Sequence, residues 1–473
     1  MNKKNLLSGR DRELLEMAES YEQSKAEGRS IYMDAEDMAD LADWYAMRRK
    51  PEMAQDVVTY GLRLHPDNTS LLVQQAYLYL ENFERDKAKE IAWQSISEDT
   101  AEVTILRAQL LLEEGQMEDA EDLLDTIEDK DDIANIIEAA YMYIDLGHPD
   151  KAQEWINLGR GKYDDDEAYL AVCADCCYAQ QNIAEAMDYF NKLIDKNPYS
   201  PPYWFGLARC YYEQGQLDKA IDACDYANLS DEDFADAYLL RANAFYELGN
   251  DEKALDNYKQ AERLELITPG FLYTLQGMDK IGKDEWQKAY EFLQKAIVAN
   301  TNPAERATLP ALYANAGFCL YKLGKRTEAE TAWETAHLLA PKEADPYLIE
   351  GRARMEGGEN DKATACWHRA TQLSPYPETW NEIGLHCLSS GQAEQACQAF
   401  ERVKEMDDSF EYIYDKLTIA YMMAGDFEKA RHCNSLSIRP LPAKQLDSIF
   451  QQLQSMDKEE IAKIISKLLE SLS

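Results

Sequence analysis

The chain is 473 residues long, with 45% hydrophobic and 10% aromatic residues, which is enough apolar material for a sizeable core. Its 88 acidic residues outnumber 49 basic ones, giving a formal net charge of -39, so we expect no nucleic-acid partner. No apolar run is long enough to span a bilayer, and residues 1–9 lack the apolar stretch of a signal peptide, so no membrane insertion is expected.

The first predicted element is a helix over residues 10–27. Leu14, Met17, Ala18 and Tyr21 fall on one of its faces at helical spacing. Such a helix can cover the open end of the structure that follows it. We therefore predict that residues 1–34 form an N-terminal capping helix.

Residues 35–442 are organised by one recurring alanine that follows a polar turn segment. The spacing between successive alanines is 32 to 35 residues, apart from one interval of 40. Self-similarity at such a period is the signature of a repeat architecture. The twelve alanines are Ala54, Ala88, Ala120, Ala152, Ala186, Ala220, Ala254, Ala289, Ala329, Ala363, Ala396 and Ala430.

Other positions keep the same phase as these alanines. Twelve residues earlier, eleven of the twelve repeats carry Ala or Gly, and sixteen residues earlier eleven carry a large apolar residue. Gly stands five residues earlier in eight repeats, where it can end a helix, and Pro stands twelve residues later in five. The pattern predicts two closely packed helices per repeat, joined by a tight turn.

This pattern resembles the tetratricopeptide repeat, a helix-turn-helix unit of 34 residues. The best match runs from Tyr203-Trp204-Phe205-Gly206-Leu207-Ala208 through Gly215 and Ala220 to Ala227, whereas Lys280, Arg354 and Asn434 depart from the expected aromatic residues. The resemblance implies an all-α fold, a right-handed α-solenoid of twelve repeats with helical caps at both ends. The 40-residue interval predicts an extended turn, and a slight break, near residues 300–310.

The last segment, residues 443–473, is predicted to form C-terminal helices. Asp457 and Glu460 resemble a capping box, and apolar residues from Ile461 to Leu472 share one stripe of the helix that follows. These helices either fold back as a cap or serve in docking or self-association.

Catalytic and metal-binding patterns are weak in this sequence. Cys173, Cys176 and Cys177 fall on inward-facing phases of a predicted helix, and no partner CxxC pair completes a zinc site. The run from Asp164 to Glu167 lacks the glycine and distal glutamate of a calcium loop, and no phosphate-binding glycine loop occurs. We therefore predict no enzymatic activity, no metal and no cofactor. The ten cysteines fit a reducing compartment, so a cytoplasmic location is expected.

The resemblance implies that the first helices of successive repeats line a concave groove that binds a partner. A lysine fifteen residues before the anchor, which one chaperone-binding variant of the family uses, is absent from every repeat. The predicted groove instead has an aliphatic strip, a row of polar and aromatic residues, and an acidic rim seven residues before the anchor. In that order the candidates are Val73, Ile105, Ile137, Phe205, Leu239 and Leu348; Tyr77, Gln109, Tyr141, Arg209, Asn243, Phe318 and Arg352; and Glu81, Glu113, Asp145, Glu213, Glu247 and Glu356.

The rim acids stand near the C-termini of the first helices, where the helix dipole disfavours carboxylates. Their recurrence there favours a role in binding, although the general acidity of the chain offers a simpler account. We expect a protein-binding scaffold for a basic or amphipathic protein or peptide. The alternative is a structural accessory subunit or spacer in a larger assembly, docked through its convex face or its C-terminal helix.

Overall fold

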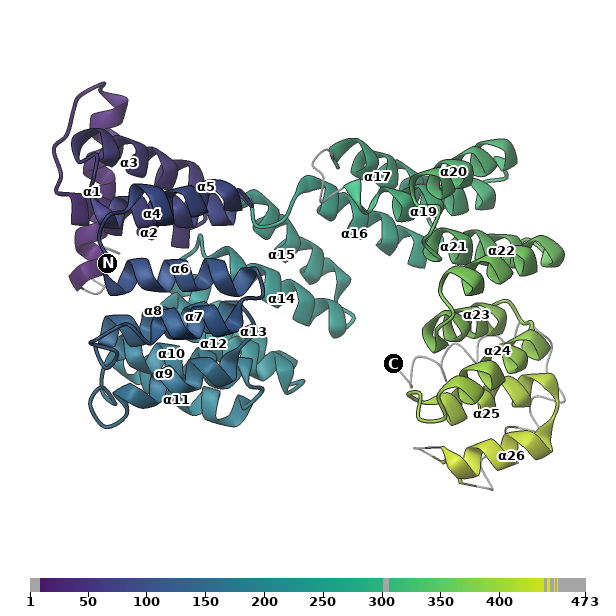
Figure 1. The fold of residues 1–473 in the computed structure, drawn as a ribbon. Coiled ribbons are helices and arrows are strands. Elements are labelled where there is room, and N and C mark those ends of the chain that lie inside the picture. The colour runs from purple at the N-terminus through teal and green to yellow at the C-terminus, as the bar shows by residue number, and fades with distance from the viewer. Residues whose placement is uncertain (1–8, 301–305, 438–439, 443–445, 447–448, 450–473) are drawn as a thin grey trace. The chain divides into compact units, whose positions relative to one another are not determined.

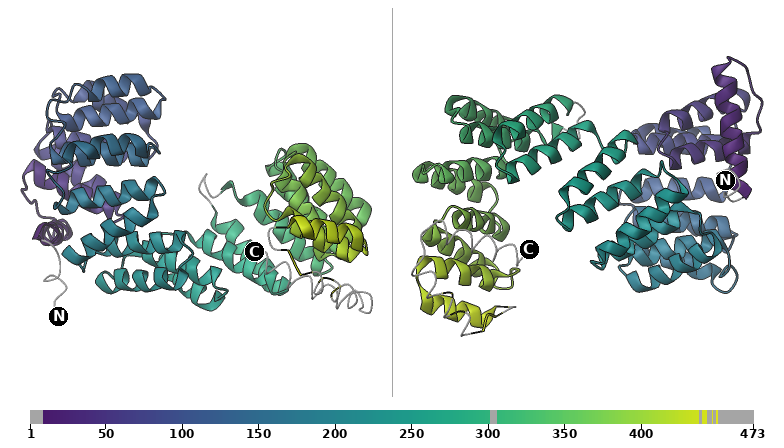
Figure 2. Two further views of the ribbon diagram at one scale, coloured as in Figure 1. Left: turned by 90° about the horizontal axis from the view of Figure 1, so that it is seen from below. Right: turned by 180° about the vertical axis from the view of Figure 1, so that it is seen from behind.

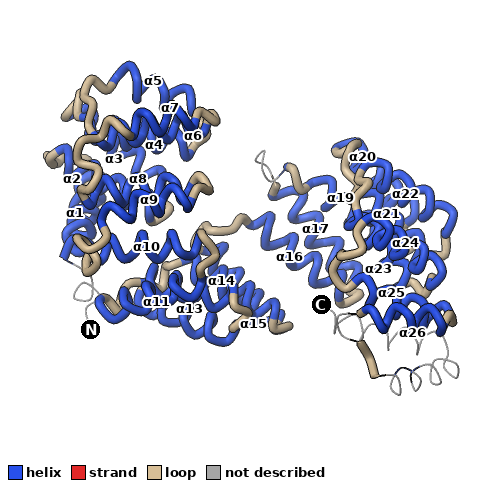
Figure 3. Tube along the Cα trace, turned by 60° about the horizontal axis from the view of Figure 1, so that its bottom comes forward, coloured by secondary structure: helices blue, strands red, loops and turns tan. Residues whose placement is uncertain are grey.

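The computed structural model of the protein describes residues 9–300, 306–437, 440–442, 446 and 449. Within these ranges the chain is all-helical and contains no strand (Figures 1 and 3). It divides into two compact units, Met1–Leu266 (unit 1) and Ile267–Ser473 (unit 2). No helix in the described part of the chain is long and apolar enough to cross a membrane.

Unit 1 consists of helix α1 (Gly9–Ala26) and seven helical hairpins (Figure 1). The hairpins are α2 and α3 (Ala35–Met47, Pro51–Leu64), α4 and α5 (Thr69–Glu81, Arg85–Glu90), α6 and α7 (Ala101–Glu113, Met117–Leu124), α8 and α9 (Ile133–Asp145, Pro149–Gly159), α10 and α11 (Glu167–Ala179, Ile183–Lys196), α12 and α13 (Pro201–Glu213, Leu217–Ser230), and α14 and α15 (Ala235–Glu247, Asp251–Arg263).

Unit 2 adds five hairpins within its described residues. They are α16 and α17 (Pro269–Gly282, Trp286–Ala299), α19 and α20 (Leu309–Lys322, Arg326–Leu339), α21 and α22 (Asp345–Glu356, Asn360–Leu373), α23 and α24 (Pro377–Ser389, Ala393–Met406), and α25 and α26 (Ile413–Ala424, Phe427–Leu436). Figure 2 shows the stacked hairpins of each unit from two further sides. Twelve hairpins over residues 35–436 confirm the predicted all-α solenoid of repeats.

The packing within each hairpin explains the periodic small residues. All twelve recurring alanines are at most 2% exposed, because they lie where the second helix crosses the first. A Cβ atom added to Gly351 would lie 2.2 Å from Nε1 of Trp367, and one added to Gly317 would lie 2.5 Å from Nε1 of Trp333. A small residue on the first helix thus leaves room for a large aromatic ring from the second helix. This packing of a large side chain against a small one sets the distance between the two helices.

The turns within the hairpins require a left-handed backbone conformation. The eight glycines that the sequence placed at these turns all have positive φ; Gly215, which follows α12, has φ +68°. Phe83 takes the corresponding place after α4 with φ +60°, and its side chain is exposed. Glycine is therefore the preferred residue at this turn but not an obligatory one.

Two irregular intervals of the sequence have structural counterparts. The intervals of 32 residues coincide with short second helices: α5 has six residues before a π-helical turn at Ile91–Ser95, and α7 has eight. The 40-residue interval falls between α17 and α19. Residues 301–305, at the centre of the predicted extended turn, lie outside the described residues.

Adjacent hairpins contact each other through the second helix of one and the first helix of the next, such as α13 with α14 and α17 with α19, and also through their first helices. α2 packs against α4, α6 against α8, and α8 against α10 in unit 1, while α19 packs against α21 and α21 against α23 in unit 2. The second helices of neighbouring hairpins make no contact of comparable extent in the described residues. The first helices therefore lie on the more tightly curved side of each stack. We call the surface they form the first-helix face.

One ion pair in unit 1 links residues that are far apart in the sequence. The Arg49 guanidinium, in the turn between α2 and α3, lies 2.8 Å from a carboxylate oxygen of Asp236 in α14. The first hairpin of unit 1 thus touches the last. Among the described residues, most other contacts between hairpins join neighbours in the stack.

The predicted N-terminal capping helix corresponds to α1. Ala18 and Tyr21 are buried against the first hairpin, in a cluster that includes Met38 and Val57. Tyr21 also donates a hydrogen bond to Asp56 at 2.7 Å. At the other end, the predicted C-terminal helix with the stripe from Ile461 to Leu472 lies outside the described residues.

Candidate partner-binding faces

The six predicted rim acids share one structural position. Each is the last residue of its first helix, on α4, α6, α8, α12, α14 and α21 respectively. A carboxylate at this place meets the negative end of the helix dipole, which destabilises it unless a donor compensates. The surroundings of these acids therefore separate structural acids from candidates for partner binding.

Four of the rim acids are bound within the protein. Glu113 accepts from Nε of Arg85 at 2.7 Å, and Glu213 accepts from the Tyr178 hydroxyl at 3.3 Å. The Tyr212 hydroxyl donates to Glu247, which repeats the link of Tyr178 one hairpin further along. Glu356 pairs with Lys322 at 2.5 Å and with Nε of Arg352 at 2.9 Å. These acids join neighbouring repeats, so their recurrence has a structural cause.

The other two rim acids, Glu81 and Asp145, form no ion pair among the described residues. Burial raises the pKa of the Glu81 carboxyl. Burial also raises the pKa of Asp145, and the nearby Asp175 adds to this shift. Both carboxylates are therefore uncompensated negative charges on the first-helix face of unit 1.

Further carboxylates gather around Tyr77 on the same face. The Tyr77 hydroxyl of α4 donates to Glu138 of α8 at 3.3 Å, and Glu138 interacts electrostatically with Glu102 of α6 and Asp43 of α2. Four consecutive first helices thus contribute to one cluster. We call Asp43, Glu81, Glu102, Glu138 and Asp145 the unit 1 carboxylates.

The pKa values of these carboxyl groups are raised by burial and by repulsion between neighbouring carboxylates. Burial raises the pKa of Glu138 to about 7, and repulsion from Glu102 and Asp43 contributes. Burial likewise raises the pKa of Asp43 and of Glu102, with smaller contributions from Glu81 and Glu36 respectively. No Lys or Arg contributes to any of these shifts. An added cation near the cluster would therefore bind favourably and lower these pKa values.

The predicted polar row continues beyond this cluster as a compensated network. Arg209 of α12 lies 2.8 Å from Asp175 of α10, and Tyr141 donates to the same carboxylate at 3.2 Å. The Arg209 guanidinium also stacks 4.4 Å from the ring centre of Tyr178 and 5.4 Å from that of Phe205. Charge on this part of unit 1 is balanced, in contrast to the surroundings of Tyr77.

The remaining unit 1 candidates differ in exposure. Val73 and Ile105 are fully buried between repeats, so they form the interior of the wall. Ile137, Phe205 and Leu239 are half-buried. Gln109 is also half-buried, and the amide oxygen of Asn243 accepts from the Tyr258 hydroxyl at 2.7 Å.

The first-helix face of unit 2 carries a different mixture. Phe318 is buried, and the guanidinium of Arg352 lies 4.9 Å from the centre of its ring. Leu348 is buried one hairpin further along. With Lys322 and Arg352 both held by Glu356, the predicted unit 2 candidates form a compensated set of charges.

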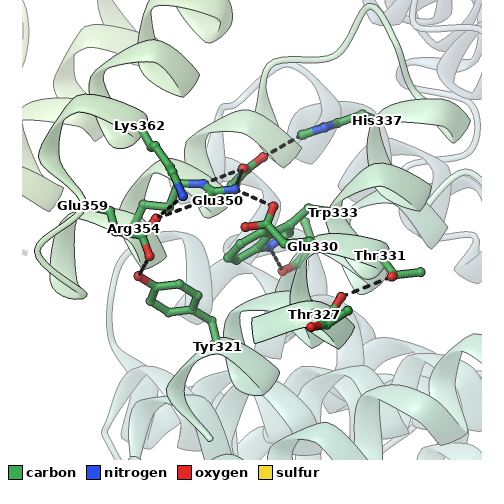
Figure 4. A network of polar contacts seen from close by, with 11 residues as sticks. Tyr321, Thr327, Glu330, Thr331, Trp333, His337, Glu350, Arg354, Glu359 and Lys362 are labelled. Carbon is green, nitrogen blue, oxygen red and sulfur yellow. Dashed lines mark hydrogen bonds and ion pairs between the residues drawn. The ribbon is translucent and has the colours of Figure 1, made fainter. Parts of the chain in front are cut away.

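Arg354, which replaces an aromatic residue of the repeat, forms the centre of a buried ionic network in unit 2. It is 5% exposed and contacts Glu350 and Glu330 at 2.6 Å and Glu359 at 3.0 Å (Figure 4). The Tyr321 hydroxyl donates to Glu359 at 2.8 Å. This network spans three helices and holds the second and third hairpins of unit 2 together.

The cysteines that the sequence singled out are core residues. Cys173, Cys176 and Cys177 are buried, and burial raises the pKa of each thiol to between about 11 and 12. The part of the chain that the structure describes contains no group of three or more His, Cys, Asp or Glu placed to hold a metal ion.

Four acidic residues of the first-helix face were absent from the predicted set. Asp43 and Asp175 occupy the same phase as Tyr77 and Tyr141, eleven residues before the anchor, so the repeat pattern could have located them. Glu102 and Glu138 stand at two other phases of their helices, and no periodic signal points to them. Only the stacking of four helices shows that they meet.

Comparisons with known sequences match part of the chain to one repeat family. Two profiles, both described as tetratricopeptide repeat, match residues 111–176 and 178–244, and residues 236–263. The chain is 28% identical over 230 residues to anaphase-promoting complex subunit cut9 of Schizosaccharomyces pombe, a match that covers 48% of this chain and 32% of that protein. It is 23% identical over 232 residues to TPR repeat-containing protein YpiA of Bacillus subtilis, covering 47% and 52%. The matches thus span about a third to a half of the length of these relatives.

Solved structures resemble the chain at low sequence identity. Yeast Tom70 aligns with a TM-score of 0.44 and 14% identity over 91% of this chain and 99% of its own. The Cut9–Hcn1 complex gives a TM-score of 0.33 and 15% identity over 82% and 90%. The twelvefold sequence period, the helical hairpins and the matched profiles together show that this chain is a tetratricopeptide-repeat protein.

Proposed function

We propose that the chain is a non-catalytic scaffold that binds a basic or amphipathic protein segment on the first-helix face of unit 1. Tetratricopeptide-repeat proteins in general act as protein-interaction scaffolds, which makes a protein or peptide the expected ligand. The observation that carries the proposal is the cluster of Asp43, Glu102 and Glu138 around Tyr77, which has no basic partner in the described residues.

The cost of this cluster to the free protein supports a binding role. Like charges in a partly desolvated place repel one another, and a cationic segment laid across them would relieve that repulsion. The half-buried Ile137 lies on the same helix as Glu138 and offers apolar contact to an amphipathic partner. Four of the rim acids are engaged within the protein, so the proposed site centres on the unit 1 carboxylates.

A second candidate function is that of a structural subunit that docks through its second helices. Leu229, Val298 and Leu338, near the ends of α13, α17 and α20, are 78%, 76% and 81% exposed. A partner that docked on the second helices would cover these exposed apolar side chains. The matched relative cut9 is named as a subunit of a complex. In this case the carboxylates of the first-helix face would be solubilising charges.

The two functions are separated by neutralising one face at a time. The test variant carries Glu81→Gln, Glu102→Gln, Glu138→Gln and Asp145→Asn. The control carries Asp122→Asn, Asp188→Asn, Asp222→Asn and Glu252→Gln, which are exposed acids on the second helices of unit 1. Both variants replace four carboxyl groups with amides.

The measurement is binding of a fluorescent peptide of alternating Lys and Ala at 0.05 to 0.5 M salt. We expect the test variant to bind about tenfold more weakly at low salt and to show a flatter salt dependence, because fewer charges steer association. The control should behave like the unaltered protein. Equal losses in both variants would show that only bulk acidity matters, and the second candidate would then be preferred.

We also propose that the chain works in the cytoplasm. The ten cysteines are all free thiols in the structure, and nine of them are buried. Free thiols that serve as core residues persist in a reducing compartment.

A further inference from the structure

An open pocket lies at the N-terminal end of unit 1, between helix α1 and the loop of residues 27–34 that leads into α2. Glu13, Glu16 and Met17 line it from one face of α1, since they stand three and four residues apart. Its volume is about 560 Å³, which lies within the usual range for ligand sites in proteins. We call it the cap pocket.

The loop wall of the cap pocket is held in place by the first hairpin. The Tyr60 hydroxyl of α3 donates to the carbonyl of Ile31 at 2.8 Å, and Nε2 of His65 donates to the carbonyl of Met33 at 3.1 Å. The His65 ring also contacts the ring of Tyr32, with 5.7 Å between the ring centres. Because these contacts already fix the loop in the free protein, a ligand would not have to order it.

Apolar side chains make up part of the lining and remain accessible. Met17, Ile31 and Met33 are half-buried, and Tyr32 is 72% exposed. An aromatic ring that a neighbour holds in place and that is open to solvent can stack on a ligand. The pocket can therefore take up the aliphatic part of a long side chain as well as a planar group.

Every charged residue in the described lining of the cap pocket is acidic. Glu13 and Glu16 lie on the α1 wall, Asp34 directly precedes α2, and Asp37 lies in the first turn of α2. Glu16, Asp34 and Asp37 form no ion pair with any other described residue. Carboxylates on both walls of a partly apolar pocket make it complementary to a cationic side chain.

The acidity of this lining is local. A neighbouring pocket of about 160 Å³ shares Ile31 with the cap pocket but is lined by Lys25, Arg29 and Arg63, and Asp56 is the one acid among its described lining residues. Two pockets on the same loop thus carry opposite charge. The general acidity of the chain therefore does not account by itself for the acids of the cap pocket.

We propose that the cap pocket binds one arginine side chain of a partner protein, with Glu16 and Asp37 accepting from the guanidinium and the ring of Tyr32 stacking on it. Met17 and Ile31 contact the methylene groups of the arginine. Arginine fits better than lysine because a planar guanidinium offers five donors to carboxylates on two walls and also stacks on an aromatic ring. This inference rests on the proposed binding of a basic partner but assigns it a second site, because none of the unit 1 carboxylates lines the cap pocket.

The test uses the full chain and a fluorescent, terminally blocked nonapeptide of Ala and Ser with one central Arg. Matched peptides carry Lys or citrulline at the centre, and citrulline keeps the shape of arginine without its charge. The first test variant carries Glu16→Gln and Asp37→Asn. Its control carries Glu52→Gln and Asp67→Asn, which are exposed acids in α3 and in the loop that follows it.

A second test variant separates stacking from charge. It carries Tyr32→Leu, and its control carries Tyr376→Leu, at a tyrosine of unit 2 that is 63% exposed. Both substitutions leave the net charge of the chain unchanged. Circular dichroism checks that every variant retains its helices.

We expect the Arg peptide to bind about tenfold more tightly than the citrulline peptide at low salt, with the Lys peptide between them. Glu16→Gln with Asp37→Asn should remove most of this preference, whereas its control should keep it. Tyr32→Leu should bring the affinity for the Arg peptide close to that for the Lys peptide, because the stacking contact favours a guanidinium. Tyr376→Leu should leave the two affinities apart.

Equal affinities for the Arg and citrulline peptides would overturn the inference, as would equal losses in the first test variant and its control. The unit 1 proposal is judged separately, by repeating the measurements in the variant in which four of the unit 1 carboxylates are neutralised. A preference for Arg that persists there and is lost with Glu16→Gln and Asp37→Asn supports the cap pocket even if the unit 1 proposal fails. A preference that is lost only when the unit 1 carboxylates are neutralised overturns the inference and leaves the unit 1 proposal standing.

Discussion

The surroundings of Tyr77 in unit 1 and of Arg354 in unit 2 are built from the same hairpin but treat charge in opposite ways. In unit 1, Asp43, Glu102 and Glu138 meet without a basic partner, and burial with mutual repulsion raises the pKa of Glu138 to about 7. In unit 2, Arg354 is surrounded by Glu330, Glu350 and Glu359. The comparison shows that a repeat fixes where side chains lie, while the residues at its variable positions decide whether a face is electrostatically satisfied.

The difference has consequences for which parts of the chain are optimised for stability. A compensated network such as that of Arg354 holds hairpins in register, because each charge has a defined partner. An uncompensated cluster of carboxylates lowers the stability of the free protein, but its charges are available to bind a cationic partner. Three substitutions test this division.

The largest effect is expected from removing the central cation of unit 2. Arg354→Leu should destabilise the protein by about 3–5 kcal/mol, because the 6% exposed Glu350 would keep a buried charge without its partner. Urea denaturation followed by circular dichroism measures this loss. The double variant Arg354→Leu with Glu350→Leu should recover much of it, whereas a single variant of unchanged stability would show that the network contributes nothing.

An intermediate loss of stability is expected from overpacking the contact between the two helices of a hairpin, a contact that both units share. Ala220 is fully buried between α12 and α13, and Ala220→Leu should cost roughly 1–3 kcal/mol by overpacking the hairpin. Ala184→Leu, on an exposed position of α11, is the matched control and should change stability by less than about 0.5 kcal/mol. If both variants melt at the same temperature as the unaltered chain, the assigned helix crossing is incorrect.

The smallest effect is expected from the pH dependence of unit 1. Because the pKa of Glu138 is raised to about 7 in the folded protein, the folded state binds its proton more tightly than the unfolded state. Stability should therefore fall as the pH rises from about 4.5 to 7 and stay lower above that range. Glu138→Gln should flatten this dependence and raise the free energy of unfolding at pH 8 by about 1–2 kcal/mol. Denaturation at pH 5.5 and pH 8 measures the difference; identical profiles for both proteins would contradict it.

The periodic positions made most of the fold predictable from the sequence. Ala220 and the other anchor alanines, together with glycines such as Gly351, make contacts between the two helices of one hairpin. Because these contacts join residues close in sequence, the small residues recur at a fixed spacing. The ends of the second helices were less predictable, since α5 and α7 shorten without changing the phase of their neighbours. The position of a residue within the repeat is thus predictable even where the length of the helix is not.

The candidate sites were less predictable because they depend on contacts between repeats. The recurrence of Glu213 and Glu247 suggested a binding rim, yet each accepts a tyrosine hydroxyl from the preceding hairpin. In contrast, Glu102 and Glu138 come together only through the stacking of α4, α6 and α8. The role of an acid in this fold follows from its partners in adjacent repeats, which a single phase does not reveal.

The contact between Arg49 and Asp236 changes how unit 1 responds to force and to ionic strength. A stack of repeats behaves as a spring, because small changes at each junction add up along its length. An ion pair between the first and last hairpins of the stack fixes the two ends of that spring to each other. Since an exposed pair of this kind contributes only about 0–1 kcal/mol, moderate salt is enough to release it. Unit 1 would then lengthen or change its curvature, and the spacing of its carboxylates would change with it.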